Sequence, residues 1–354
     1  MTSRKSSPTV LSPFFASSGI LLGMLTVLTV LTVLTVLTTA SPALGDGAGG
    51  AVPASASPSA VVPMPSPFAA FPSRFALQDG KKVHFRVAGD GPVSLVLIHG
   101  WTCDLEFWRE QLPLAKRFRL LLVDLPGHGR SDLPASWSMD VFARAVEAAM
   151  REAGVPKAVL VGHSMGTPVA RQFLRLFPAK TAGIVAVDGT FRSYIADPEM
   201  VKAYLASLEG GEGLSLFKRS VDGMIQPVAD PALREFIRTR MGAAPQAVIA
   251  GAARAMFDLS IWKDDPIGVP LLSILAKGPA WDEGYRNYVR KLNPSAAFVE
   301  LEGVSHFLML EKPGPVNDAI ADFATKVMNA SMATTPAATA SEAPFSRSSA
   351  SPGR

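Results

Sequence analysis

The sequence has little of what marks several classes of protein. Its 354 residues include a single cysteine, Cys103, which has no partner for an intramolecular disulfide and cannot build a zinc site alone. Charged residues make up only 18% of the chain, and the net charge of +4 comes without a run of lysine or arginine, so nucleic acid is not an expected partner. What the chain has instead is 48% hydrophobic residues, which supports a well-buried core.

Residues 1–45 predict a targeting segment. Arg4 and Lys5 precede an apolar stretch over about residues 19–38, and small residues at 43–45 fit a signal-peptidase cleavage site. The stretch is also about long enough to cross a bilayer core, so the alternative is a retained membrane anchor. We expect the chain to be exported to the periplasm or the cell exterior, or to be attached to a membrane through this segment.

Low-complexity sequence flanks the rest of the chain. Residues 46–72 are rich in Pro, Ala, Ser and Gly and predict a linker, while residues 331–354 predict a disordered tail. Residues 45–50 formally match the dinucleotide pattern G-x-G-x-x-G. No strand precedes them and no amphipathic helix follows, so we treat the match as accidental.

One domain is expected over residues 73–330, with strands and helices in alternation. Two segments flanking Asp79-Gly80 predict a hairpin, and continuous apolar runs predict buried parallel strands. The hairpin spans 74–78 and 82–87, the buried strands 93–100, 119–126, 158–164, 183–189, 269–278 and 296–303, and three intervening helices 104–117, 138–153 and 165–178. This order predicts an α/β domain with a mostly parallel sheet and helices on both faces.

The alternation stops between about residues 191 and 266, where we expect an inserted helical cap over one edge of the sheet. Its apolar residues at helical spacing are interpreted mainly as the cap's own small core, with a substrate pocket as the alternative for some of them. These residues are Met200, Tyr204, Phe217, Met224, Phe236, Met241, Met256 and Phe257.

The stretch VGHSMGT, residues 161–167, places Ser164 between a buried strand and a helix. Such a tight turn forces its central residue into strained geometry and needs small neighbours, which Gly162 and Gly166 supply. The serine hydroxyl would then stand above the carboxyl edge of the sheet, where open α/β sheets bind ligands. Ser164 is therefore the candidate nucleophile.

A serine hydroxyl is a weak nucleophile without a base, and the chain has five histidines. His306 follows the last predicted strand, on a loop at the same sheet edge as Ser164, and is the candidate base. The other four lie inside a strand, at a strand end, in an earlier turn and directly beside the serine: His84, His99, His128 and His163.

Acyl chemistry also needs two backbone N–H donors for the developing oxyanion. We expect one from Met165, directly after the nucleophile, and one from Trp101, on the loop after strand 93–100, where Gly100 allows a sharp bend. The Trp101 indole is expected to line the pocket or to pack under the cap.

Four blocks in this order, HGW, DLPGHGRSD, GHSMG and GVSHFLMLEKP, resemble the α/β-hydrolase superfamily in its cap-bearing branch, over roughly residues 80–328. The resemblance implies a Ser–acid–His triad in that chain order, no cofactor and no metal. It places Asp124 in a structural turn. For the acid it leaves two positions: Asp188 after strand 183–189, which we prefer, and Asp282 in the segment after strand 269–278, slightly later than relatives place theirs.

The nucleophile narrows the expected reaction. Dehalogenases and epoxide hydrolases of this superfamily carry an aspartate where this chain has Ser164, so the resemblance implies a serine hydrolase that cleaves a carboxylic ester through an acyl-enzyme. The expected partner is a small molecule with an apolar acyl or alcohol part. Alternatives are carbon–carbon bond hydrolysis or cofactor-free haloperoxidase and perhydrolase chemistry with the same triad, and, more remotely, a non-catalytic ligand-binding protein.

Overall fold

A computed structural model describes residues 65–333. The predicted targeting segment, most of the predicted linker and nearly all of the predicted tail lie outside the described residues. Within residues 65–333, none of the helices combines the length and the hydropathy needed to cross a bilayer.

The centre of the domain is an eight-stranded sheet in the order β1-β2-β4-β3-β5-β6-β7-β8. β2 pairs antiparallel with β1 and with β4, and every pairing from β4 to β8 is parallel. The strands are β1 (Arg74–Gln78), β2 (Lys81–Ala88), β3 (Ser94–Ile98), β4 (Arg119–Val123), β5 (Ala158–His163), β6 (Thr181–Val187), β7 (Leu271–Ala276) and β8 (Ala297–Leu301). The expected mostly parallel sheet is confirmed, and the carboxyl ends of its parallel strands meet at one edge.

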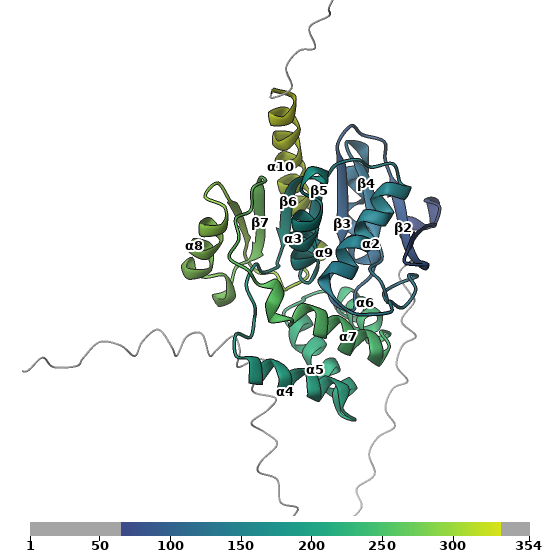
Figure 1. The fold of residues 1–354 in the computed structure, drawn as a ribbon, viewed down its shortest axis with the longest axis vertical. Helices are drawn as coiled ribbons and strands as arrows, with labels where there is room; N and C mark the ends of the chain where they lie inside the picture. Colours follow the sequence, from purple (N-terminus) through teal and green to yellow (C-terminus); the bar gives the residue numbers. More distant parts are fainter. Residues whose placement is uncertain (1–64, 334–354) are drawn as a thin grey trace, which may run out of the picture.

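Helices cover both faces of the sheet, which explains why the central strands are apolar along their whole length. α2 and α3 pack against each other over one face, while η3 and α10 pack together over the other (Figure 1). β5 is buried at every residue. The elements that cover the sheet or flank it are η3 (Leu105–Lys116), α2 (Met139–Glu152), α3 (Gly166–Leu176), η4 (Pro178–Lys180), η6 (Pro279–Trp281), α8 (Glu283–Leu292), α9 (Leu308–Glu311) and α10 (Pro313–Ala333).

Two segments differ from their expected form. The helix expected over 104–117 is the 3₁₀ segment η3, which is interrupted by non-helical dihedral angles at Trp108 and contains Pro113, a residue without a backbone N–H. The second segment is the C-terminal end of the expected linker. There η2 (Pro67–Ala70) buries Phe68 completely, and Arg86 donates a hydrogen bond to the Phe68 carbonyl at 2.9 Å. The packed domain therefore begins inside the stretch expected to be linker.

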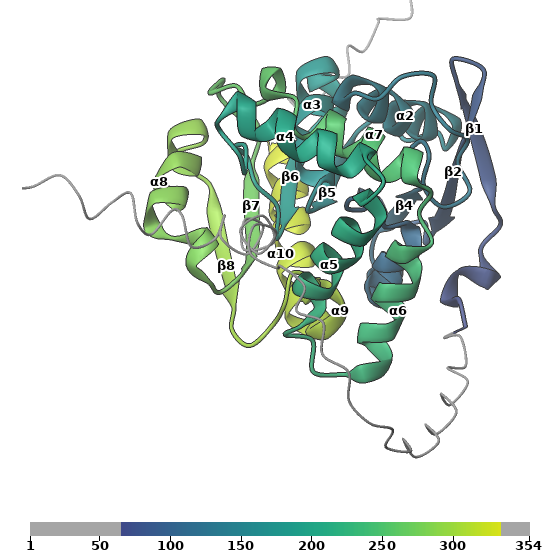
Figure 2. The same cartoon turned by 90° about the horizontal axis from the view of Figure 1, so that it is seen from below.

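The cap follows β6 and consists of helices across residues 191–266. Its elements are α4 (Pro198–Glu209), α5 (Gly213–Ile225), α6 (Pro231–Gly242), α7 (Gln246–Met256) and the short turn η5 (Leu259–Ile261). Figure 2 shows these helices in front of the carboxyl ends of the strands. The cap thus covers the sheet edge that carries Ser164.

Candidate active site

Ser164 lies at a strained turn between β5 and α3. Its φ of 51° is in the left-handed region, which residues with a side chain rarely adopt, and its N–H is held by the Val187 carbonyl on β6 at 3.0 Å. The flanking glycines are required by crowding. A methyl group at Gly162 would lie 2.3 Å from the Gly166 carbonyl oxygen, and one at Gly166 would lie 2.2 Å from that of Ile98. Crowding and hydrogen bonding together fix the position of the serine.

His306 and Asp188 form a hydrogen-bonded pair beside this turn. His306 Nδ1 lies 2.7 Å from Asp188 Oδ2, and both residues sit on loops at the carboxyl edge of the sheet. Ser164 and His306 line the same cavity, although among the described residues no hydrogen bond joins them. Bonds between a nucleophile and its base are often long in unliganded enzymes. The three residues therefore stand in the order that the resemblance implies.

Asp188 is held in place by two further donors. Its Oδ1 accepts hydrogen bonds from the Ala276 N–H and from the Trp281 indole N–H, both at 2.8 Å. The backbone of Asp188 is itself in the left-handed region, with φ at 45°. This second strained residue next to the nucleophile indicates that the surrounding sheet determines where the carboxylate points.

Asp282, the alternative acid, takes a different place. Its carboxylate caps the first turn of α8 and accepts a hydrogen bond from the Tyr285 N–H at 2.8 Å. The structure therefore brings Asp188, and not Asp282, to His306. Trp281, which precedes Asp282 in the chain, donates a hydrogen bond to Asp188.

The other buried aspartate, Asp124, belongs to a structural turn. It accepts hydrogen bonds from the Leu105 and Arg130 amides and contacts His84 Nδ1 at 2.7 Å. Burial would raise the pKa of Asp124, but the bond from His84 and the neighbouring histidines lower it overall. In the same turn, burial lowers the pKa of His128 to about 3, so this histidine is neutral in the folded protein. These groups form the frame under the site and do not reach the cavity.

Two backbone amides close to Ser164 in the chain or in space have no hydrogen-bond partner among the described residues. Among the described residues, neither the Trp101 N–H nor the Met165 N–H donates a hydrogen bond. Gly100 brings the Trp101 loop close, since a methyl group there would lie 3.2 Å from Ser164 Cβ. This pair of free donors beside a serine at a helix N-terminus is the arrangement that stabilises an oxyanion.

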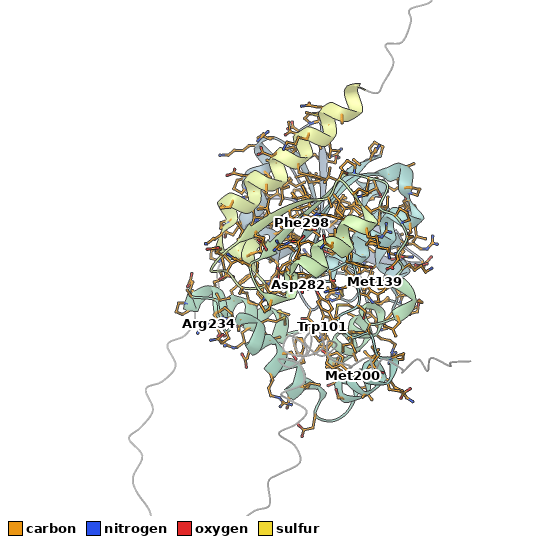
Figure 3. The ribbon with its side chains drawn as sticks, turned by 90° about the vertical axis from the view of Figure 1, so that its left-hand side faces the viewer. Trp101, Met139, Met200, Arg234, Asp282 and Phe298 are labelled. Carbon is orange, nitrogen blue, oxygen red and sulfur yellow. The ribbon has the colours of Figure 1, made fainter. Side chains whose placement is uncertain are left out.

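The Trp101 indole both packs and binds the cap. Its N–H donates a hydrogen bond to the Ile249 carbonyl on α7 at 3.0 Å, and its ring meets Phe217 edge-on at 5.2 Å. Figure 3 shows Trp101 between the sheet and the cap helices. Trp101 also lines the cavity, so it has both of the roles expected of it, lining the pocket and packing under the cap.

A cavity of about 450 Å³ lies between the sheet edge and the cap. Its size falls in the usual range for small-molecule sites. Ser164 and His306 form one side, and the cap contributes mostly apolar side chains. All eight apolar cap residues singled out in the sequence belong to the hydrophobic core or pack against it, as expected, and five of them also line the cavity: Tyr204, Met224, Met241, Met256 and Phe257.

His163 has a role that its place beside the nucleophile did not reveal. Its Nε2 lies 2.9 Å from the His306 carbonyl oxygen, so it holds the loop that carries the base. Burial, reinforced by His306, keeps the pKa of His163 well below its usual value, so the ring is neutral and donates one N–H. Neither His163 nor Trp281 could have been assigned from a motif, because their contacts cross between distant segments of the chain.

Within residues 65–333, no group of three or more His, Cys, Asp or Glu side chains is arranged to hold a metal ion. Cys103 lines the cavity, and burial raises the pKa of its thiol well above the usual value. A buried, protonated thiol is a poor nucleophile. Ser164 therefore remains the candidate nucleophile of the cavity.

Known proteins resemble this chain in sequence and structure. A pimeloyl-[acyl-carrier protein] methyl ester esterase of Methylococcus capsulatus is 37% identical over 152 residues, covering 42% of this chain and 53% of that enzyme. The enzyme of the same name from Edwardsiella ictaluri is 27% identical over 256 residues, covering 68% of this chain and 96% of that enzyme. A thermophilic esterase from Thermogutta terrifontis has a TM-score of 0.64 at 25% identity, covering 72% of this chain and 99% of the esterase. Residues 95–319 match the Alpha/beta hydrolase family, so the chain belongs to that family.

Proposed function

We propose that this protein hydrolyses carboxylic esters through an acyl-enzyme on Ser164, with His306 as general base and Asp188 as its orienting acid. The observation that carries the proposal is the contact between Asp188 and His306 on the rim of the cavity that contains the strained serine. That contact fixes the proton on His306 Nδ1 and leaves Nε2 to accept the serine proton.

The reaction follows from these positions. Ser164 Oγ attacks the ester carbonyl and its proton passes to His306 Nε2, while the negative oxygen accepts hydrogen bonds from the Trp101 and Met165 amides. The protonated His306 then gives its proton to the departing alcohol. Water attacks the acyl-enzyme by the same route, with His306 again as base, and releases the carboxylic acid.

The cavity favours an ester with an apolar chain. Met224, Met241, Met256 and Phe257 give it an apolar cap side, and apolar walls with few polar groups are typical of sites that bind apolar substrates. The relatives named for methyl ester cleavage support a small alcohol as the leaving group. The proposed substrate is therefore a small ester with an apolar acyl part and a small alcohol.

Burst release of p-nitrophenol from p-nitrophenyl acetate tests the nucleophile. We expect a burst equal to the enzyme concentration, and its loss in Ser164→Ala. The matched control is Ser215→Ala, because Ser215 is an exposed serine on the cap helix α5. Equal slow release by the wild type and Ser164→Ala would refute an acyl-enzyme at this position.

We also propose that residues 1–45 direct export, either as a cleaved signal or as a membrane anchor. The basic start, the apolar stretch and the small residues at 43–45 support this. Expression of the full chain in a bacterial host, followed by fractionation and intact mass, tests it. A mature form beginning near residue 46 outside the cytoplasm supports cleavage, full-length protein in the membrane supports the anchor, and full-length protein in the cytoplasm refutes export.

A further inference from the structure

The cap contains a second hollow next to the active-site cavity. It is an open groove of about 610 Å³ between α4, the end of α7 and the segment before α2. Its lining combines apolar residues, Trp137, Val201 and Leu205 among them, with charged residues such as Lys202 and Arg254. A groove with this lining can hold an apolar chain whose far end meets water.

Phe257 separates the groove from the active-site cavity. Among the described residues it is the only one that lines both. It follows α7 directly, and its backbone N–H donates a hydrogen bond to the Ala253 carbonyl at 2.8 Å, which fixes the backbone position of Phe257. The ring meets Tyr204 of α4 edge-on at 5.1 Å and is only 7% exposed. Together the two rings close the space between α4 and α7.

The neighbours of Phe257 sort to either side of it. Tyr204 and Met256 line the active-site cavity, while Leu205, which follows Tyr204, and Asp258, which follows Phe257, line the groove. The partition is therefore one side chain thick at Phe257. Removing the phenyl ring would join the two spaces without changing Ser164, His306 or the oxyanion donors.

We propose that Phe257 sets the longest apolar chain that the substrate can carry, and that the groove behind it is a continuation of the chain-binding site. This rests on the proposed ester hydrolysis and names the substrate feature that the cap selects. In the wild type, a chain that fills the cavity ends against the ring. A longer chain must displace the ring to reach the groove.

The test is a chain-length profile of kcat/KM for the wild type, Phe257→Ala and Phe257→Leu. One series varies the acyl group of p-nitrophenyl esters from acetate through butyrate and octanoate to palmitate. A second varies the alcohol of alkyl acetates from methyl to decyl, followed by acid release. The series that shifts identifies whether the acyl or the alcohol chain points at Phe257.

We expect Phe257→Ala to move the optimum of one series to longer chains. Because each methylene accommodated in an apolar pocket is worth about tenfold in kcat/KM, the longest esters should gain by at least about tenfold relative to the shortest. Phe257→Leu should give a smaller shift. Met241→Ala is the matched control: Met241 lines the cavity but not the groove, so it enlarges the space without opening the partition.

A block placed in the groove separates its use from simple enlargement. Leu205 lines the groove and not the cavity, so Leu205→Arg in the Phe257→Ala background should cancel the gain for long chains and leave short esters unchanged. Thermal unfolding of each variant verifies that it is folded. An unchanged profile in both Phe257 variants, or a gain that survives the block, would overturn the proposal. If Ser164→Ala cleaves short esters as fast as the wild type, the proposed function itself fails instead.

Discussion

The sheet edge and the cap hold their residues in different ways. At the sheet edge, backbone hydrogen bonds between strands fix the site: the Ser164 N–H bonds to Val187 at 3.0 Å and the Asp188 N–H to Ile274 at 2.8 Å. The cap meets this edge through side chains, including the Trp101 indole on Ile249. Backbone pairing between buried strands leaves little freedom, whereas a side-chain interface can repack. Changes at the sheet edge should therefore alter kcat, and changes in the cap should alter KM and selectivity.

The largest effect is expected from Asp188→Asn. The two donors on Asp188 Oδ1, Ala276 N–H and Trp281 Nε1–H, would hold the asparagine oxygen, so its NH₂ would face His306. His306 Nδ1 must then accept, and Nε2 carries the proton and cannot take one from Ser164. We expect kcat to fall by about 10⁴-fold with KM nearly unchanged, as an inverted tautomer does in other serine enzymes.

Asp282→Asn is the matched control for that variant. Asparagine caps a helix about as well as aspartate, so α8 should keep its first turn and the enzyme should keep its activity and its stability. Steady-state kinetics on p-nitrophenyl acetate compare the two. A large loss of kcat in Asp282→Asn, with Asp188→Asn active, would contradict the arrangement seen here.

These two aspartates show how far the sequence could predict the site. Ser164 was predicted from a local pattern, a glycine-flanked serine between a strand and a helix. His306 was predicted by elimination among five histidines and by its place on a loop at the same sheet edge. The choice between Asp188 and Asp282 depends on donors that reach Asp188 from Ala276 and Trp281, about 90 residues away in the chain. Such contacts depend on how β6 and β7 pair, and no local pattern encodes them.

The cap and the domain boundary were harder to predict for a related reason. Apolar spacing identifies the apolar face of a helix but not what that face contacts. In the sequence, Tyr204 and Met256, which line the cavity, therefore have the same pattern as Phe236, which packs against the core. Phe68 shows the same limit: it stands in a Pro/Ala/Ser-rich stretch, yet it is completely buried against the domain. The fold class, the strands and the place of Ser164 at the turn between β5 and α3 were predictable, while the rotation of the cap helices was not.

His128 tests whether the frame under the sheet edge is as rigid as the comparison requires. Burial lowers its pKa from 6.5 to about 3 in the folded state. Below pH 6.5 His128 therefore binds a proton in the unfolded chain but not in the folded chain. The contribution of His128 to the free energy of unfolding is fully present above pH 6.5 and is lost as the pH falls toward 3. We expect His128→Gln to reduce the slope of unfolding free energy by about 1.4 kcal/mol per pH unit in that window.

Urea unfolding at several pH values between 4 and 8 measures this slope. Comparing the wild type and His128→Gln at the alkaline end gives the cost of the substitution itself, because the histidine is neutral in both states there. Parallel curves throughout the range would mean that His128 opens to water and takes up its proton in the folded state.

Trp281→Phe should have the next largest effect. It removes one of the two donors that hold Asp188 Oδ1 and keeps most of the buried ring. A hydrogen bond to a charged group is worth about 1.5 to 3 kcal/mol, so kcat should fall by at least about tenfold while KM stays near its wild-type value. Trp262→Phe provides the control, since the Trp262 indole bonds to the Met256 carbonyl at 3.2 Å, away from Asp188. A change in KM alone would place Trp281 with the cap and not with the triad.

The smallest effect is expected from Trp101→Phe, which cuts a contact between the two regions. It removes the indole bond to Ile249 but keeps the backbone amide beside Ser164 and much of the packing against Phe217. The net worth of such a bond is about 1 kcal/mol. The Ile249 carbonyl lies within α7 and keeps its helical partner, so no buried acceptor is stranded. We expect KM to rise a few-fold and kcat to change little on p-nitrophenyl acetate. A fall in kcat as large as that of Trp281→Phe would instead mean that the cap positions the oxyanion amide, and that the two regions act as one unit.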